Sequence, residues 1–155
     1  MRLFPALCFS MLFLLSLDGF AAWQGKAKAP AIFVDSEGVA IAGYDVVSYF
    51  EGSVPRKGTT MWQADHKGAR FLFASDANRQ RFVKDPDRFV PQFGGYCAFA
   101  MAAGKRKSCD PRRFSLRDGK LFLFSGATPR DRWLQDEASW LAKAVAAWRS
   151  LMGQE

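Results

Sequence analysis

The chain has 155 residues and a net charge of +7, and 49% of its residues are hydrophobic. If the first 22 residues are set aside, the remaining 133 are enough for one domain with its own core. No later stretch is long and apolar enough to span a membrane, which excludes a second span. Aromatic residues make up 15% of the chain and predict a core rich in rings.

The first 22 residues have the order of a secretory signal. Met1 and Arg2 form a basic start, residues 3–17 are almost wholly apolar, and Ala21 and Ala22 end the segment. The apolar run is shorter than the roughly 20 residues that a membrane span needs. We therefore expect cleavage after Ala21 or Ala22 and export to a periplasm or the medium. The alternative is an uncleaved anchor.

The basic charge favours anionic partners such as lipid headgroups or cell-wall polymers. Export makes nucleic acid the least favoured partner, and a weak attraction to anionic surfaces is the expectation. A generically soluble basic protein is the alternative. The basic residues gather in three places, Lys105-Arg106-Lys107, Arg112-Arg113 and Arg130 with Arg132.

Residues 23–31 lack apolar periodicity and are expected to be a flexible lead-in, followed by a single domain over residues 32–152. Short strands are expected at residues 32–34 and 39–41. Asp45 is a natural N-cap for a helical turn that runs to Phe50. Residues 59–65 and 69–74 predict a hairpin, and Ser75 is the expected N-cap of the next helix.

The second half predicts a similar mixture of elements. A small-residue helix is expected over residues 96–103, closed by Gly104. Asp118-Gly119 between two alternating runs predicts a second hairpin. A final amphipathic helix follows Thr128-Pro129, with an apolar stripe that ends at Trp148. The class is therefore α+β, with small antiparallel hairpins, short helices and a C-terminal amphipathic helix. The sequence indicates no internal repeat.

Several short motifs, in this order, resemble the YHS domain family and in particular its exported single-domain members. The resemblance covers about residues 39–150 and implies a fold related to treble-clef metal binders. The motifs are Gly43-Tyr44-Asp45-Val46-Val47-Ser48-Tyr49-Phe50, His66-Lys67-Gly68, Phe71-Leu72-Phe73-Ala74-Ser75, Asp85-Pro86, Pro91-Gln92-Phe93-Gly94-Gly95-Tyr96-Cys97-Ala98, Asp110-Pro111 and Asp118-Gly119-Lys120-Leu121.

The chain departs from the metal-binding members of that family. They carry cysteines where this chain has Ala74 and Asn78, and Asp65 stands in place of the tyrosine before His66. Because thiolates hold zinc and copper(I) tightly, the usual metal site of those relatives is not available here.

His66 and Cys97 are the residues that could carry chemistry. His66 is either a half-exposed turn residue or a metal ligand or general base. Cys97, at the start of a helix, has three interpretations: a disulfide with Cys109, a buried inert thiol, or a ligand or nucleophile.

Met101 lies one helical turn after Cys97, on the same helix face. A thioether, a thiolate and an imidazole would suit copper(I) better than zinc, so His66, Cys97 and Met101 form a candidate metal site. Met61, on the strand that leads to His66, could add to it. The alternative is that these methionines fill gaps in the core.

The remaining motif residues are expected to serve the fold, with Asp45 and Asp110 as caps. They are Gly43, Tyr44, Asp45, Ser75, Gly94, Gly95, Tyr96 and Asp110. The sequence thus favours an exported, non-enzymatic domain that binds a small ligand or a copper-like metal. A ligand-free structural or protein-interaction domain is one alternative, and a thiol-dependent enzyme that uses Cys97 is another.

Overall fold

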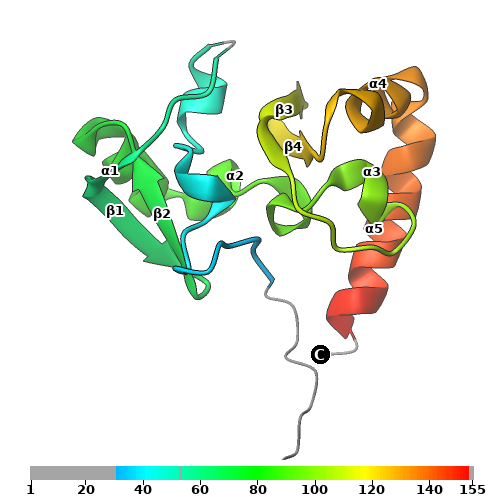
Figure 1. Cartoon of the computed structure of the whole chain (residues 1–155), viewed down its shortest axis with the longest axis horizontal. Coiled ribbons are helices and arrows are strands. Elements are labelled where there is room, and N and C mark those ends of the chain that lie inside the picture. The colour runs from blue at the N-terminus through cyan, green and yellow to red at the C-terminus, as the bar shows by residue number, and fades with distance from the viewer. Residues whose placement is uncertain (1–30, 53, 154–155) are drawn as a thin grey trace, which may run out of the picture.

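Two antiparallel β-hairpins, each followed by helices, form the fold (Figure 1). The structure is a computed structural model that describes residues 31–52 and 54–153, so the expected signal segment and most of the lead-in lie outside the described residues. The α+β class is confirmed. The elements are η1 (Ile41–Gly43), η2 (Ser48–Phe50), β1 (Thr59–His66), β2 (Ala69–Phe73), α1 (Asp76–Lys84), α2 (Pro86–Phe89), η3 (Gln92–Gly95), α3 (Ala98–Met101), β3 (Asp110–Arg117), β4 (Lys120–Phe124), α4 (Ala127–Gln135) and α5 (Glu137–Gly153).

Both hairpins close through two-residue turns in which both residues have positive φ. Lys67 and Gly68 have φ of 49° and 77°, and Asp118 and Gly119 have φ of 49° and 70°. Turns of this kind match the right-handed twist of the flanking strands, and glycine adopts positive φ without steric cost. The hairpin expected around Asp118-Gly119 is therefore present, with Arg117 paired to Lys120.

The two hairpins belong to an internal repeat, so the expectation of no repeat was wrong. The second copy of each element lies 51 residues after the first: Thr59–His66 and Asp110–Arg117, Ala69–Phe73 and Lys120–Phe124, Asp76–Lys84 and Ala127–Gln135. Both hairpins shift register at the same point of the long strand. We call residues 59–89 the first unit and residues 110–153 the second unit; they form the two halves of the molecule in Figure 1.

Aromatic packing explains why the two units have the same fold although most of their aligned residues differ. Phe71 and Phe73 lie on Phe82, with ring centroids 4.7 and 5.1 Å apart. Their counterparts, Phe122 and Phe124, lie on Trp133 at 5.5 and 5.7 Å. The identical positions are few and are Gly68/Gly119, Phe71/Phe122, Leu72/Leu123, Phe73/Phe124, Arg79/Arg130, Arg81/Arg132 and Asp85/Asp136.

The core consists of two clusters that meet at β4. Leu121 and Leu123 belong to the cluster built around the first unit, whereas Phe122 and Phe124 belong to the cluster of the second unit. Because successive side chains of a strand point to opposite faces, both faces of β4 are buried. This strand therefore joins the two halves.

The segment before the first hairpin differs from the expected pair of strands. Only an isolated bridge joins Val34 to Ala40, and Ile41–Gly43 is a 3-10 turn. Within the segment Asp35 N–H donates to Val39 O at 3.0 Å and Ile41 N–H donates to Phe33 O at 3.3 Å. Two other bonds leave the segment: Phe33 N–H donates to Gly94 O at 2.8 Å, and Ala40 N–H donates to Arg70 O at 2.7 Å. The segment is thus a short hairpin-like turn without regular strands, and it is also tied to η3 and β2.

The C-terminal helical region is divided where a single helix was expected. Asp136 has φ of −150°, which ends α4 and separates it from α5. The small-residue helix is also shorter than expected, because α3 spans only Ala98–Met101. Among residues 31–52 and 54–153, no helix has the length and apolar character that a membrane span requires.

Candidate functional site

His66 lies at the end of β1, next to the first hairpin turn. Its ring packs edge-on against Phe82 with centroids 5.9 Å apart, and its Nε2 lies 3.5 Å from Asp87 Oδ1. Lys67 Nζ donates a 2.6 Å hydrogen bond to the same carboxylate oxygen. Lys67, and to a smaller degree His66, hold the pKa of Asp87 below its usual value. His66 is 19% exposed, so it is neither a freely accessible turn residue nor fully enclosed.

Cys97 and Met101 lie in the other half of the core. Both side chains are fully buried in the cluster that contains Phe122, Phe124 and Trp133. The structure therefore brings Cys97 and Met101 together in one cluster but leaves His66 in contact with the other. Met61 is 75% exposed and joins neither cluster. In the described part of the chain, no group of three or more His, Cys, Asp or Glu residues could hold a metal ion.

Cys97 and Cys109 are both free thiols. The chain that follows α3 turns back alongside Cys97, because Cys97 N–H donates to Lys107 O at 2.9 Å. Burial, together with the neighbouring Cys97, raises the pKa of Cys109 to about 12. Cys109 is therefore a neutral thiol near pH 7 and a weak nucleophile. The Cys97–Cys109 disulfide stays a prediction.

Asp45 is fully buried and is the centre of a hydrogen-bond network. Its Oδ1 accepts bonds from Val47 N–H at 2.9 Å and Ser48 N–H at 3.3 Å, which is the capping that the sequence predicts. Its Oδ2 accepts from Ala74 N–H at 3.0 Å and from Asn78 Nδ2 at 2.8 Å. Four donors thus compensate for the burial of one carboxylate.

The same network contains Ala74 and Asn78. Both donate to one oxygen of Asp45, Ala74 through its backbone N–H and Asn78 through its side-chain amide. Ser75 caps α1, since its Oγ accepts from Asn78 N–H at 3.2 Å. Hydrogen bonds to one carboxylate therefore link the end of β2 to the first turn of α1.

The glycine-tyrosine motifs occupy equivalent positions in the two halves. Gly43 and Gly95 have φ of 74° and 84°, and the tyrosine that follows each is extended. Tyr44 lies below Lys57, whose Nζ is 4.6 Å from the ring centroid, and Tyr96 packs against Phe33. Burial raises the pKa of Tyr96. Because Asp45 and Cys97 directly follow these tyrosines, Cys97 is the structural counterpart of Asp45.

A cleft of about 630 Å³ opens along β3, at the edge of the second unit. Its lining consists of residues 112–116 of β3, Arg130 of α4 and Gly52 of the loop after η2. Tyr49 fixes this strand to the first half of the molecule, because its hydroxyl donates to Pro111 O at 2.8 Å and its ring packs edge-on against Phe114. Burial raises the pKa of Tyr49, so this hydroxyl stays a donor over a wide pH range.

Three arginines line the cleft and outnumber the carboxylates that pair with them. Arg112 bonds to Asp110 through Nε at 3.1 Å and Nη2 at 3.2 Å, which holds the pKa of Asp110 below its usual value and raises that of Arg112. Arg113 Nε lies 3.9 Å from the same carboxylate. Arg130 Nε donates to Phe114 O at 2.8 Å, while its Nη1 lies 3.7 Å from Asp131.

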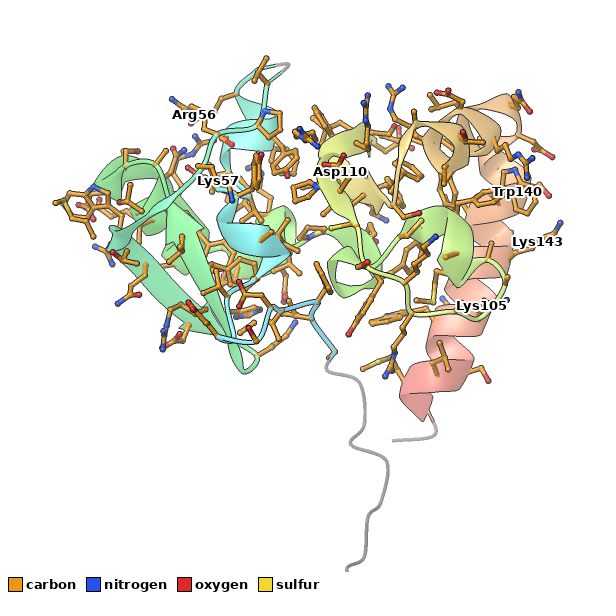
Figure 2. The ribbon with its side chains drawn as sticks, in the orientation of Figure 1. Arg56, Lys57, Lys105, Asp110, Trp140 and Lys143 are labelled. Carbon is orange, nitrogen blue, oxygen red and sulfur yellow. The ribbon has the colours of Figure 1, made fainter. Side chains whose placement is uncertain are left out.

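The cleft was not identified as a site from the sequence, although two of the basic groups noted there contribute to it. Figure 2 shows Asp110 on the side of β3 that faces the first half of the molecule. Asp110 therefore anchors arginines at the cleft in addition to its expected role as a local cap: its Oδ1 also accepts Arg112 N–H at 3.0 Å.

Comparison of the chain with family models, with curated proteins and with solved structures found no match.

Proposed function

We propose that this chain is an exported, non-enzymatic domain of the YHS type that binds a small anion in the cleft along β3. The excess of guanidinium groups in that cleft carries the proposal. Arg112, Arg113 and Arg130 face two carboxylates, and their side chains are 72%, 51% and 40% exposed. Each guanidinium therefore keeps donors that a ligand could reach.

The chemistry of the lining favours a phosphate or carboxylate group. Arginine presents its N–H donors in a planar fork that matches both anions. The bond from Arg130 to Phe114 O fixes one guanidinium in place, so less side-chain entropy is lost when an anion binds. The volume of about 630 Å³ is typical of small-ligand sites.

The positions of the thiols and the imidazole support binding rather than catalysis. Cys97 is fully buried among aromatic rings, which leaves a substrate no direct path to its sulfur. Binding of copper or zinc by His66, Cys97 and Met101 is less well supported than binding of an anion in the cleft, because the three side chains are divided between two clusters. A structural or protein-interaction domain is the alternative if the cleft binds nothing.

Calorimetric titration with inorganic pyrophosphate and with citrate tests the proposal for the two anion classes. We expect saturable binding of at least one of them, weakened about tenfold in Arg113→Gln, as is typical for loss of one charged hydrogen bond. Arg113 is the best position because its ion pair is the longest of the three. Arg70→Gln removes the same charge from the exposed side of β2 and serves as the matched control. No saturable binding, or equal loss in both variants, would overturn the proposal.

A further inference from the structure

The face formed by α3, the loop after it and α5 is rich in cations, and Glu137 at the start of α5 is its one acidic residue among those that the structure describes. Neither residues 98–109 nor residues 138–153 contain an Asp or Glu. The loop after α3 lies beside α5, because the Arg106 guanidinium contacts the Trp148 ring and donates to Met152 Sδ at 3.6 Å. The basic residues of these two segments are Lys105, Arg106, Lys107, Lys143 and Arg149.

The acidic residue at the start of α5 is already neutralised. Glu137, at the start of α5, lies 3.1 Å from Arg117 Nη1 and accepts a 3.1 Å hydrogen bond from Trp133 Nε1. It therefore adds little negative field to the cations further along α5. The face keeps its positive charge over the physiological pH range, because Lys and Arg do not lose their protons there.

Aromatic rings lie directly among these cations. Trp140 packs against Phe99 with centroids 4.8 Å apart, and Lys143 Nζ lies 4.7 Å from the centre of the Trp140 ring. The Arg106 guanidinium lies 5.7 Å from the Trp148 ring. Both tryptophans are half-buried. Figure 2 shows Lys105, Trp140 and Lys143 together at one side of the molecule, beside α5.

Trp140 and Trp148 are half-buried, so part of each ring reaches the surface beside a cation. Half-buried tryptophans with lysine beside them are the residues that favour the headgroup level of a membrane.

We propose that this face, which is separate from the cleft along β3, binds the surface of an anionic membrane. Charge complementarity provides the attraction, and Trp140 and Trp148 provide the preference for a lipid interface over a water-soluble polymer. The inference does not depend on the proposed function, since none of the residues that line the cleft belongs to this face.

Flotation of the full chain with vesicles tests this inference. Vesicles of phosphatidylcholine are compared with vesicles in which about a third of the lipid is phosphatidylglycerol. We expect binding to the anionic vesicles only, with a blue shift of the tryptophan emission. Raising the salt to about 0.5 M should weaken the binding strongly, because the charges are exposed.

Two triple variants separate this face from the overall charge. Each cation near an anionic membrane contributes roughly a fivefold change in partition, so Lys105→Gln/Lys107→Gln/Lys143→Gln should lower binding about a hundredfold. Arg70→Gln/Lys84→Gln/Arg88→Gln removes the same charge from the first unit and should change it much less. The amino-terminal residues are identical in all three proteins and cannot cause a difference.

Three outcomes would overturn the inference. They are equal losses in the two triple variants, equal binding to both kinds of vesicle, and binding to heparin with none to anionic vesicles. The last result would assign the face to a polymer. Arg113→Gln should leave vesicle binding unchanged, so failure of the cleft proposal and failure of this one can be distinguished.

Discussion

The side-chain amide of Asn78 donates a 2.8 Å hydrogen bond to the carboxylate of Asp45, which lies 33 residues earlier in the chain. Both residues are buried, with exposed fractions of 3% and 0%. The bond joins the N-terminal turn of α1 to the segment between η1 and η2. The loss of such a contact is costly in free energy of unfolding, because water cannot replace the missing donor to a buried carboxylate.

Asn78→Ala is expected to destabilise the protein by about 2–3 kcal/mol, since it removes a hydrogen bond to a buried charged group. Urea unfolding followed by circular dichroism measures the change. Gln80→Ala is the matched control: it removes an exposed hydrogen bond to Asp76 from the same helix and should cost less than about 0.5 kcal/mol. Similar losses for the two variants would contradict the role given to Asp45.

Gly94→Ala should destabilise the protein far more than Gly104→Ala. Both glycines have positive φ, 63° and 68°, so the backbone strain of an alanine is similar. A Cβ on Gly94 would lie 1.8 Å from Ala31 O, whereas one on Gly104 meets nothing within 4 Å. We expect a loss of about 1 kcal/mol at Gly104 and about 3 kcal/mol or more at Gly94. Thermal unfolding of both variants compares them directly, and equal melting temperatures would argue against a fixed position for residue 31.

Alkaline pH should weaken the fold through Cys109. Burial raises the pKa of this thiol from 9.0 to about 12, so the unfolded chain loses the proton first and the native state binds more protons. The contribution of the thiol is therefore complete below about pH 9 and is lost as the pH rises towards 12. Tyr49 acts with the same sign above its ordinary pKa of 10.0. Urea unfolding at a series of pH values should show a smaller decline for Cys109→Ala between about pH 9 and pH 10.

Asp110→Asn should strengthen anion binding to the cleft severalfold. The substitution keeps the shape of the side chain but removes the charge that pairs with Arg112 and lies near Arg113. Because Arg112 holds the pKa of Asp110 below its usual 3.8, this residue stays charged above about pH 4, and its titration should not change the affinity of the wild type there. Pyrophosphate titrations of both proteins at neutral pH measure the effect. Weaker binding in Asp110→Asn would mean that the carboxylate positions the arginines more than it competes with the ligand.

The sequence predicted the turns and helix starts, because these depend on residues that are neighbours in the chain. The hairpin at Asp118-Gly119 follows from the positive φ of its turn, and the start of α1 follows from the hydroxyl of Ser75. The break at Asp136 was not predicted, because the apolar stripe continues across it from Trp133 to Trp140. The repeat was missed because aromatic positions preserve it while the residues between them differ.

The surroundings of the candidate site residues depend on contacts between distant segments. Cys97 was expected at a helix start, and α3 does follow it directly. Its side chain, however, is buried in a cluster to which Phe122 and Trp133 belong, and these residues come from elements later in the chain. The arginines of the cleft were visible as basic groups. That they line one cavity follows from the packing of the Gly52 loop near β3, which no local pattern in the sequence indicates.

The alternation of side chains along β4 makes the two halves of the molecule interdependent. If the second unit separated from the first, Leu121 and Leu123 would become exposed to water together with the partners they cover. Each unit of the repeat therefore depends on the other for the burial of its apolar residues and is not an independent folding module. The chain should melt as one cooperative body, and a proteolytic fragment that holds a single hairpin should not refold alone.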